Sequence, residues 1–172
     1  AAAIPGSDVT VENLYLSPER TGFLEVLLRM GADLDIDRHA GVVRAYGAEL
    51  SGTIVDAAEL PGLIDEVPAL SIAGSLATSG TLEFRGAAEL RTKESDRIET
   101  VAAMLRALGS VVSTGPDSLT VSAGALRPGA VESHRDHRIA MAAAVAACGL
   151  SSEGAIEISG WEAVATSYPG FL

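Results

Sequence analysis

Positive charge is scarce in this chain of 172 residues. Only 12 Lys and Arg residues accompany 23 Asp and Glu residues, so the formal net charge is -11. Nucleic acids and anionic membrane surfaces attract proteins that present a basic field. We therefore expect neither as a partner, and an anionic ligand would have to be held by a local cluster of cations.

Cysteine is nearly absent too, since Cys148 is the only one. A single cysteine cannot form an internal disulfide, and a zinc site built from several thiolates is excluded. Cys148 lies in the Ala-rich run M-A-A-A-V-A-A-C-G. Because free cysteines are usually buried, we predict that it is a small core residue.

Long apolar runs are also missing. No stretch approaches the ~20 residues of a membrane span, and none has the basic start, apolar middle and cleavage site of a signal peptide. Hydrophobic residues nevertheless make up 48% of the chain, which is enough for a packed core. We expect a bacterial cytoplasmic location, or the plastid stroma if the source is a plant.

Short segments of similar pattern recur along the chain. Strands that alternate apolar and polar residues are predicted at residues 8–14, 81–87 and 155–161, each after an Ala-rich stretch and a glycine. Helices are predicted at residues 17–31 and 95–109, and further strands follow them. The order helix, strand, helix, strands recurs at roughly 70 residues, which predicts an α/β chain of related units.

The predicted helices differ in the faces that they bury. Helix 17–31 has clear start and stop signals: Ser17 is the expected cap, Pro18 stands at the first helical position, and Gly31 ends the helix. Helix 95–109 has one apolar face, formed by Ile98, Val101, Ala102, Leu105 and Leu108. The Ala-rich helices are apolar nearly all round, which predicts burial on every side. We therefore expect the helices to lie inside the domain and the sheets to cover them on the outside.

Both ends of the chain suggest a piece of something longer. Residues 1–4 resemble the tail of an Ala-rich helix, and residues 167–172 stop where a third unit would begin its second helix. We therefore expect residues 1–172 to be a single domain from a longer protein.

The one lysine of the chain lies in a dense group of charges. Lys93 stands beside Glu94, Asp96 and Arg97, where start signals predict the first turn of helix 95–109. The helix dipole disfavours cations at this end by up to about 1 kcal/mol, a cost that makes sense if a ligand supplies negative charge. Free backbone N–H groups with a lysine and an arginine favour a phosphate or carboxylate. A solvated helix end is the alternative interpretation.

A second cationic group precedes the last Ala-rich helix. Arg135, His137 and Arg138 surround Asp136 at the start of a helix that is too apolar to be exposed. Two cationic helix starts in equivalent positions of neighbouring units can converge on one anion, which weakens the interpretation of each as a solvated helix end.

A third segment carries acids instead. Asp65 and Glu66 immediately precede Pro68 and an apolar helix. Taken alone, they are acids of the kind that the helix dipole favours at an N-terminus. When all three segments are considered together, the interpretation of Asp65 and Glu66 as ordinary helix-start acids loses weight against a functional one.

The three segments resemble one enzyme family. The run L-R-T-K-E-S-D-R-I at residues 90–98 resembles the L-R-x-K-E-S/T-D-R signature of the 5-enolpyruvylshikimate-3-phosphate (EPSP) synthase family. The runs D-H-R-I-A-M-A at residues 136–142 and D-E-V-P-A-L at residues 65–70 are similar to further family segments in the same order. Residues 5–33 also fit, so the resemblance covers the chain but only the C-terminal part of the family's usual length.

This resemblance implies a fold and a reaction. Family members transfer the enolpyruvyl group of phosphoenolpyruvate to the 5-hydroxyl of shikimate 3-phosphate and release phosphate, with no metal or organic cofactor. Their fold has two similar domains, each an inside-out α/β barrel of three βαβαββ units, with the site in the cleft between them. The chain resembles about two and a half units of one domain. The N-terminal domain would be its missing partner, and the chain alone is expected to be inactive.

The resemblance also implies residue roles. Arg97 and Arg138 would hold the phosphate and carboxylate of phosphoenolpyruvate, and Lys93 would contact the shikimate 3-phosphate side and assist proton transfer. Glu94 would be the general acid that protonates the methylene carbon, and Asp65 the partner base that binds the shikimate hydroxyls. His137 matches a site position without a defined role.

Two other readings stay open. The related enolpyruvyl transferase that acts on UDP-N-acetylglucosamine shares the fold, but it would be expected to carry a catalytic cysteine on a loop and no K-E-S-D-R run. A non-catalytic anion-binding domain of the same fold is the second alternative.

Overall fold

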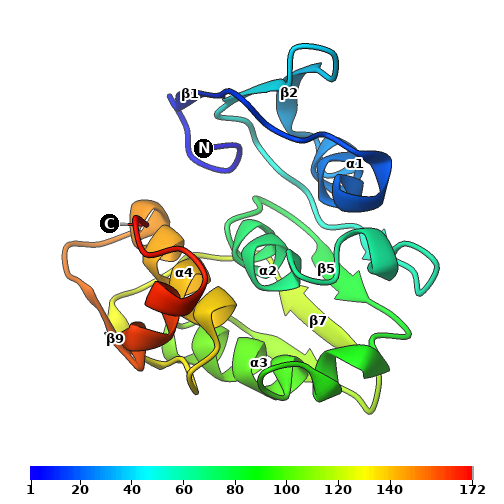
Figure 1. Ribbon diagram of the computed structural model, residues 1–172. Helices are drawn as coiled ribbons and strands as arrows, with labels where there is room; N and C mark the ends of the chain where they lie inside the picture. Colours follow the sequence, from blue (N-terminus) through cyan, green and yellow to red (C-terminus); the bar gives the residue numbers. More distant parts are fainter. Residues whose placement is uncertain (172) are drawn as a thin grey trace.

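Among residues 1–171, which the computed structural model describes, three β-sheets and four α-helices alternate along the chain (Figure 1). The first group of elements consists of β1 (Asp8–Val11), α1 (Gly22–Arg29), β2 (Asp33–Asp37) and β3 (Val42–Tyr46). Its strands form an antiparallel sheet in the order β1-β3-β2.

The middle of the chain forms a complete βαβαββ unit. Its elements are β4 (Ile54–Val55), α2 (Val67–Ser75), β5 (Thr81–Phe84), α3 (Arg97–Ala107), β6 (Val112–Thr114) and β7 (Leu119–Ser122). β4 pairs with β5 in parallel, and the antiparallel order β5-β7-β6 repeats the order β1-β3-β2 of the first sheet. The predicted helix, strand, helix, strands repeat is therefore confirmed.

A third group starts the pattern again. It consists of β8 (Gly129–Glu132), α4 (His137–Ala146) and β9 (Ile156–Ser159), and β8 pairs with β9 in parallel, as β4 does with β5. The sequence patterns did not predict β4 and β8. β4 has only two residues, and β8 begins with Gly and Ala, so neither displays a clear alternation of apolar and polar side chains.

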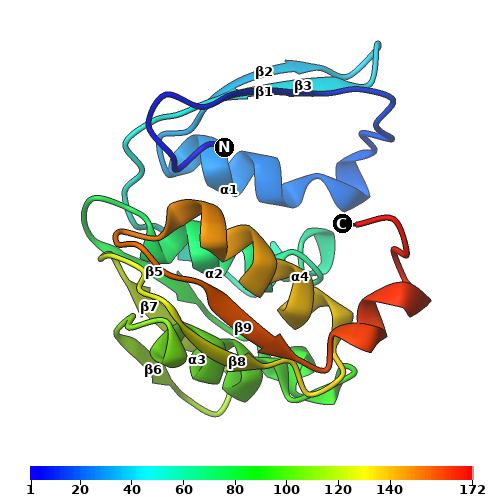
Figure 2. The ribbon, with the colours of Figure 1, turned by 90° about the vertical axis from the view of Figure 1, so that its left-hand side faces the viewer.

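The core lies between the sheets, around α2. Figure 2 shows α2 and α4 beneath the layer of α1 and the first sheet, with the strands of the other two sheets on their opposite side. Most residues of α2 are buried, and Gly74 lets the helix approach β5, because a Cβ atom there would come within 2.8 Å of the side chain of Leu82. The predicted arrangement of helices inside and sheets outside is confirmed for α2, whereas α4 leaves Val145 exposed.

The start of α3 differs from the prediction. Its N-cap is Asp96, whose carboxylate accepts a hydrogen bond from the backbone N–H of Glu99 at 3.3 Å. Lys93 and Glu94 therefore precede the helix, in the loop after the 3-10 helix η3 (Ala88–Thr92). The predicted apolar face of α3 is confirmed, because all five of its residues are buried.

The start of α1 also differs. Pro18 opens a separate 3-10 turn, η1 (Pro18–Arg20), and the α-helix begins only at Gly22 after the N-cap Thr21. Gly31 ends this helix as predicted, with a φ of +98° that favours glycine.

Two further predictions were wrong. Cys148 is exposed, because it lies in the 3-10 helix η4 (Ala147–Gly149) that follows α4 at the surface. Residues 1–4 form a turn rather than a helix, closed by a hydrogen bond from Ile4 N–H to the Ala1 carbonyl. Within the described residues, no helix combines the length and apolar character needed to cross a membrane.

Candidate active site

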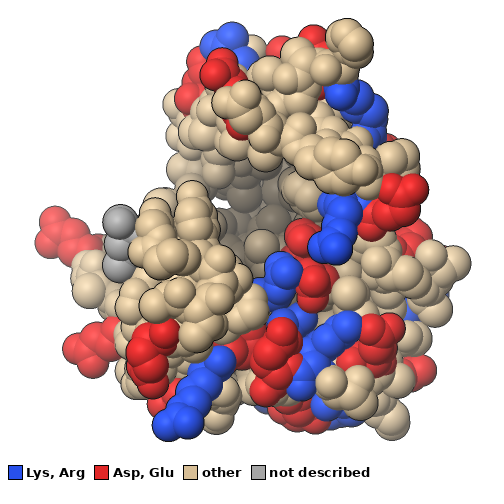
Figure 3. Space-filling model, in the orientation of Figure 1, with Lys and Arg blue, Asp and Glu red and all other residues tan. Residues whose placement is uncertain are grey.

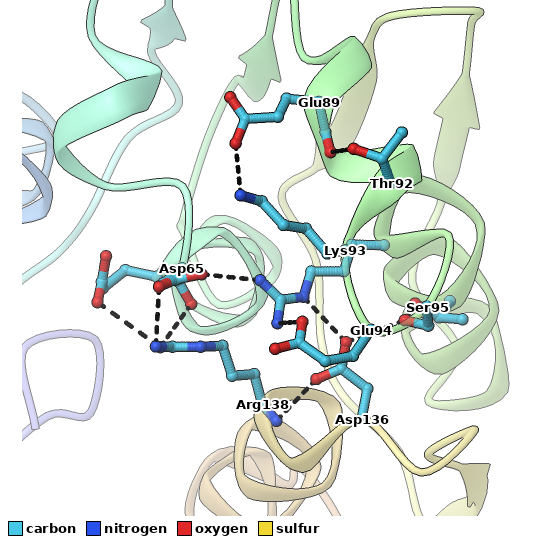
Figure 4. Close-up of polar contacts among 11 residues, drawn as sticks. Asp65, Glu89, Thr92, Lys93, Glu94, Ser95, Asp136 and Arg138 are labelled. Atoms are coloured by element: carbon cyan, nitrogen blue, oxygen red, sulfur yellow. Dashed lines mark hydrogen bonds and ion pairs between the residues drawn. The ribbon is translucent and has the colours of Figure 1, made fainter. Parts of the chain in front are cut away.

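Asp65 is the point at which the three sequence segments meet (Figure 4). One oxygen of its carboxylate accepts a hydrogen bond from Arg97 Nη1, and the other accepts one from Arg138 Nη2, both at 2.9 Å. Its backbone carbonyl accepts a further bond from Arg138 Nη1 at 3.1 Å. The arginines of the two cationic helix starts thus lie on either side of one carboxylate, that of Asp65. The convergence of these helix starts on an anionic ligand stays a prediction.

Arg97 is the buried centre of this group. Its side chain is 0% exposed, and each nitrogen of its guanidinium faces a different carboxylate: Nε faces Asp136 at 2.9 Å, Nη1 faces Asp65, and Nη2 faces Glu94. Burial acts to lower the pKa of Arg97, but the hydrogen bonds and charges of these acids outweigh it and hold the pKa above its ordinary value. We call Asp65, Glu94, Arg97, Asp136 and Arg138 the Asp65 cluster.

Asp136 joins the two signature runs. Its buried carboxylate accepts hydrogen bonds from Ser95 Oγ at 3.0 Å, from Arg97 Nε at 2.9 Å and from the backbone N–H of Arg138 at 3.0 Å. Burial acts to raise the pKa of Asp136, but these donors outweigh it and lower the pKa. Asp136 also caps α4, so one carboxylate fixes both the guanidinium of Arg97 and the start of that helix.

A strained turn delivers Asp136 to this position. His134 and Arg135 both have left-handed backbone angles, with φ of +52° and +60°, which residues with a Cβ atom seldom adopt. The turn is closed by hydrogen bonds from Asp136 N–H to the Ser133 carbonyl and from Ser133 N–H to the Ser159 carbonyl on β9. Strain of this kind persists where the surrounding structure holds it, often at a functional site.

Lys93 and Glu94 lie on the loop that leads into α3. Lys93 Nζ donates to the carboxylate of Glu89, four residues earlier, and its side chain is partly exposed. The side chain of Glu94 is 51% exposed even though it contacts Arg97. Figure 4 shows Lys93 reaching toward Glu89, while Glu94 lies with the other members of the cluster.

Glu66 and His137 lie next to the cluster. Glu66 is 3.8 Å from Arg138, and its pKa is raised, chiefly because burial disfavours the charged carboxylate. His137 is the first residue of α4, but its ring takes no part in the hydrogen bonds that join the cluster. The sequence interpretation had treated Asp65 and Glu66, taken alone, as acids favoured at a helix N-terminus. Glu66 is the N-cap residue of α2, but its side chain makes no capping hydrogen bond, and Asp65 binds the two arginines instead.

The sequence analysis missed three residues that shape this site. Asp136 and Ser95 had no assigned role, although both belong to the signature runs, and Glu89, the partner of Lys93, was not considered. Their positions within or just before the two motifs were the available signal. A spacing pattern cannot reveal which charged groups pair, because pairing depends on how α2, α3 and α4 pack.

The charge balance of the site is unusual for one expected to bind anions. Four carboxylates contact the guanidinium groups of Arg97 and Arg138, namely those of Asp65, Glu66, Glu94 and Asp136. A phosphate or carboxylate ligand would have to replace one of them. Asp136 is fully buried, whereas Asp65 and Glu94 are partly exposed, so a replaced Asp65 or Glu94 carboxylate would have solvent beside it. Among residues 1–171, no group of His, Cys, Asp and Glu has an arrangement suited to a metal ion.

The family model for EPSP synthase (3-phosphoshikimate 1-carboxyvinyltransferase) matches residues 1–172 of the chain. The chain belongs to the EPSP synthase family. It is 47% identical to the 3-phosphoshikimate 1-carboxyvinyltransferase of Xanthomonas campestris pv. campestris strain B100 over 99% of the chain, and 46% identical to that of Pelotomaculum thermopropionicum. It spans only 40% and 41% of the length of these two relatives.

Solved structures agree with this family assignment. An EPSP synthase of Acinetobacter baumannii matches 99% of the chain and 41% of its own length, with a TM-score of 0.88 and 38% identity. The enolpyruvyl transferase NikO of Streptomyces tendae matches with a TM-score of 0.73 and 20% identity, which bears on the fold alone. The predicted enolpyruvyl-transferase-like α/β fold is confirmed.

Cys148 has no place in the candidate site of this EPSP synthase family member. It follows the C-terminal end of α4, whereas the Asp65 cluster lies at the N-terminal end of that helix. Ten helical residues separate the two ends by about 15 Å. A mechanism with a catalytic cysteine therefore has no support at this site.

Proposed function

We propose that the chain is one domain of an EPSP synthase and supplies about half of its active site. The reaction would transfer the enolpyruvyl group of phosphoenolpyruvate to the 5-hydroxyl of shikimate 3-phosphate and release phosphate. The observation that carries this proposal is the position of Asp65 between Arg97 and Arg138, with Lys93 and Glu94 on the adjoining loop.

The proposed chemistry needs one acid and one base at close quarters. The 5-hydroxyl oxygen adds to C2 of phosphoenolpyruvate and loses its proton, while the methylene carbon C3 gains a proton, which gives a tetrahedral intermediate. Loss of phosphate from C2 and of a proton from C3 then regenerates the double bond. Glu94 is the proposed donor and later acceptor of the proton at C3, and Asp65 is the proposed base for the hydroxyl.

The partly exposed acids support these roles. Phosphoenolpyruvate would be held by Arg97 and Arg138 once Asp65 and Glu94 release them, because a guanidinium binds phosphate and carboxylate groups through paired hydrogen bonds. The same movement would bring both acids next to the reacting carbons. Lys93 would leave Glu89 for the phosphate of shikimate 3-phosphate, and His137 would lie at the edge of the site.

The charge of the domain supports a second, missing half. The two substrates carry several negative charges. This site offers two arginines and one lysine, which are paired with the acids Asp65, Glu66, Glu89, Glu94 and Asp136. Further cations would come from the other domain of the same enzyme, which we infer as the partner. No cofactor is required for the proposed steps, and we infer a cytoplasmic enzyme, or a plastid one if the source is a plant.

Reconstitution tests this proposal. The chain is mixed with the separately expressed part of a bacterial relative that it does not match, and phosphate release is measured with both substrates present. We expect no turnover by the chain alone, turnover by the mixture, and loss of that turnover when the chain carries Glu94→Gln. Two halves that associate but stay inactive would favour a non-catalytic anion-binding domain. Turnover by the chain alone would contradict the proposal that the chain supplies only half of the active site.

A further inference from the structure

Apolar and charged surfaces lie side by side on this chain. Figure 3 shows a central hollow with uncharged walls, and the charged side chains gather to one side of it. The hollow is an apolar groove bounded by Ala1–Ile4, by α1 and the inner face of the first sheet, and by α2. Among the charged side chains, Arg97 belongs to the Asp65 cluster. Arg91, the other arginine of the run at residues 90–98, lies outside that cluster and has contacts of a different kind.

Every N–H group of the Arg91 guanidinium has an acceptor within the protein. Nε donates to the Pro116 carbonyl at 2.7 Å, and Nη2 donates to the Gly115 carbonyl at 2.6 Å. Nη1 donates to the Asp96 carboxylate at 2.7 Å, and Nη1 and Nη2 each donate to Glu99 Oε1 at 3.3 Å. These hydrogen bonds use all five N–H groups of the guanidinium. In this arrangement Arg91 has no donor left for a substrate anion.

The ion pair of Arg91 with Asp96 closes the loop that leads into α3. Residues 92–95 run between the two partners, and Lys93 and Glu94, both proposed to act in catalysis, lie among them. Arg91 belongs to η3, while the other oxygen of Asp96 accepts the capping hydrogen bond of α3. One ion pair therefore holds both ends of the loop.

The turn between β6 and β7 supports this loop from behind. It provides the two carbonyls, those of Gly115 and Pro116, that accept hydrogen bonds from Arg91. In addition, the N–H of Ala87, the N-cap of η3, donates to the Asp117 carbonyl of the same turn at 2.6 Å. η3 is thus fixed to the turn at both of its ends. A lysine could not replace Arg91 here, because a single ammonium cannot meet several acceptors as a planar fork of donors does.

The loop side chains have partners that substrate binding would replace. Under the proposed function, Glu94 releases Arg97, and Lys93 leaves Glu89. The partners of Arg91 are not among the residues proposed to bind substrate, so its hydrogen bonds would persist while the loop side chains change partners. Arg91 would then keep both ends of the loop in place throughout the reaction.

We propose that Arg91 is a positioning residue, which holds residues 92–95 in the conformation from which Lys93 and Glu94 act on the substrates. The proposal rests on the proposed function, because Arg91 acts through these two residues and touches no substrate itself. Precise placement matters, since a displacement of about 1 Å can lower the rate of an enzyme about 10²-fold.

Arg91→Lys tests the proposal in the reconstituted enzyme, because it keeps the charge and removes the fork of donors. The rate constant of a single turnover, with the mixture in excess over shikimate 3-phosphate, does not depend on the fraction of folded molecules. We expect it to fall about tenfold or more. The phosphoenolpyruvate concentration for half-maximal rate should change less than about twofold, since Arg97 and Arg138 keep their own contacts. In the chain alone, the amides of residues 92–95 should exchange at least about tenfold faster.

Arg106→Lys is the matched control. Arg106 lies in the last turn of α3, away from the loop, and donates to the Val112 carbonyl at 3.2 Å. This variant should keep the turnover rate and the hydrogen exchange of the parent. Asp96→Asn is the reciprocal variant, because asparagine still caps a helix but weakens the pair with Arg91. The losses caused by Arg91→Lys and Asp96→Asn should not add in the double variant.

The outcomes can be told apart. An active parent mixture with an unchanged single-turnover rate for Arg91→Lys would overturn the positioning role and leave the proposed function standing. Unchanged exchange of residues 92–95, additive losses in the double variant, or an equal loss for Arg106→Lys would also overturn that role. A parent mixture without turnover would overturn the proposed function, and the positioning role with it.

Discussion

Asp65 and Arg97 are joined by a 2.9 Å ion pair although 32 positions separate them in the sequence. The bond holds the segment before α2 against the first residue of α3. Because Asp65 also binds Arg138 at the start of α4, one carboxylate sets the relative positions of three helix starts. The chain's own charges therefore hold the three helix starts together, and its acids occupy the positions at which the proposed function places the anionic groups of the substrates.

Replacement of Arg97 by methionine should strongly destabilise the chain. The change would leave Asp136 buried without its guanidinium partner, and breaking one side of a buried pair typically costs about 3 to 5 kcal/mol. Urea unfolding monitored by circular dichroism would measure this loss as a lower transition midpoint.

Arg85→Met provides the matched control for this substitution. Arg85 pairs with Glu83 at the same 2.9 Å distance, but both side chains are partly exposed, and such pairs contribute at most about 1 kcal/mol. Equal losses of stability for the Arg97 and Arg85 variants would contradict the central role of Arg97.

Glu66→Gln should stabilise the chain at neutral pH. Burial raises the folded-state pKa of Glu66 above 4.5, so ionisation of Glu66 destabilises the folded state. This destabilisation is fully present only above the folded-state pKa. The free energy of unfolding of the variant should therefore exceed that of the parent at pH 7, with a smaller difference at pH 4. Denaturant titrations at the two pH values measure it.

Asp136→Asn should change the free energy of unfolding in the opposite direction. The folded-state pKa of Asp136 lies below its ordinary value of 3.8, so its ionised form stabilises the fold above that pH, and this contribution is lost as the pH falls through the folded pKa. The variant should be less stable than the parent at pH 7, with the difference shrinking below pH 3.8. A gain in stability at pH 7 would contradict the assigned hydrogen bonds.

Lys93→Met should abolish most activity of the reconstituted enzyme while leaving the fold intact. Loss of a group that assists proton transfer typically lowers the rate by about 10² to 10⁴. The pair with exposed Glu89 should contribute no more than about 0.5 kcal/mol to stability. Phosphate release and thermal unfolding, measured on the same samples, separate the two effects.

Arg44→Met is the control for the charge lost in that experiment. Arg44 lies on β3 and pairs with Asp8 on β1 of the first sheet, away from the Asp65 cluster. Its variant also loses one positive charge, yet it should keep the turnover of the parent mixture. A similar fall in both variants would indicate a general effect of net charge rather than a role for Lys93.

Local patterns predicted much of the fold. The apolar face of α3 repeats with the period of a helix, and its five members are buried because one face of a surface helix must meet the core. The repeated units were visible because each needs the same order of helix, strand and turn residues. The exposure of Cys148 could not be predicted, because an average tendency toward burial does not say which side of a helix end faces solvent.

The sequence by itself determined the repeating α/β architecture and the charged segments that belong together, because periodicity and motif spacing are properties of neighbouring residues. Only the tertiary structure decided that Asp65 lies between Arg97 and Arg138, that Asp136 locks Arg97 in the core, and that the first sheet leaves an apolar groove open. These relationships join residues tens of positions apart, and the free energy of packing the helices together, rather than any local preference, brings them into contact.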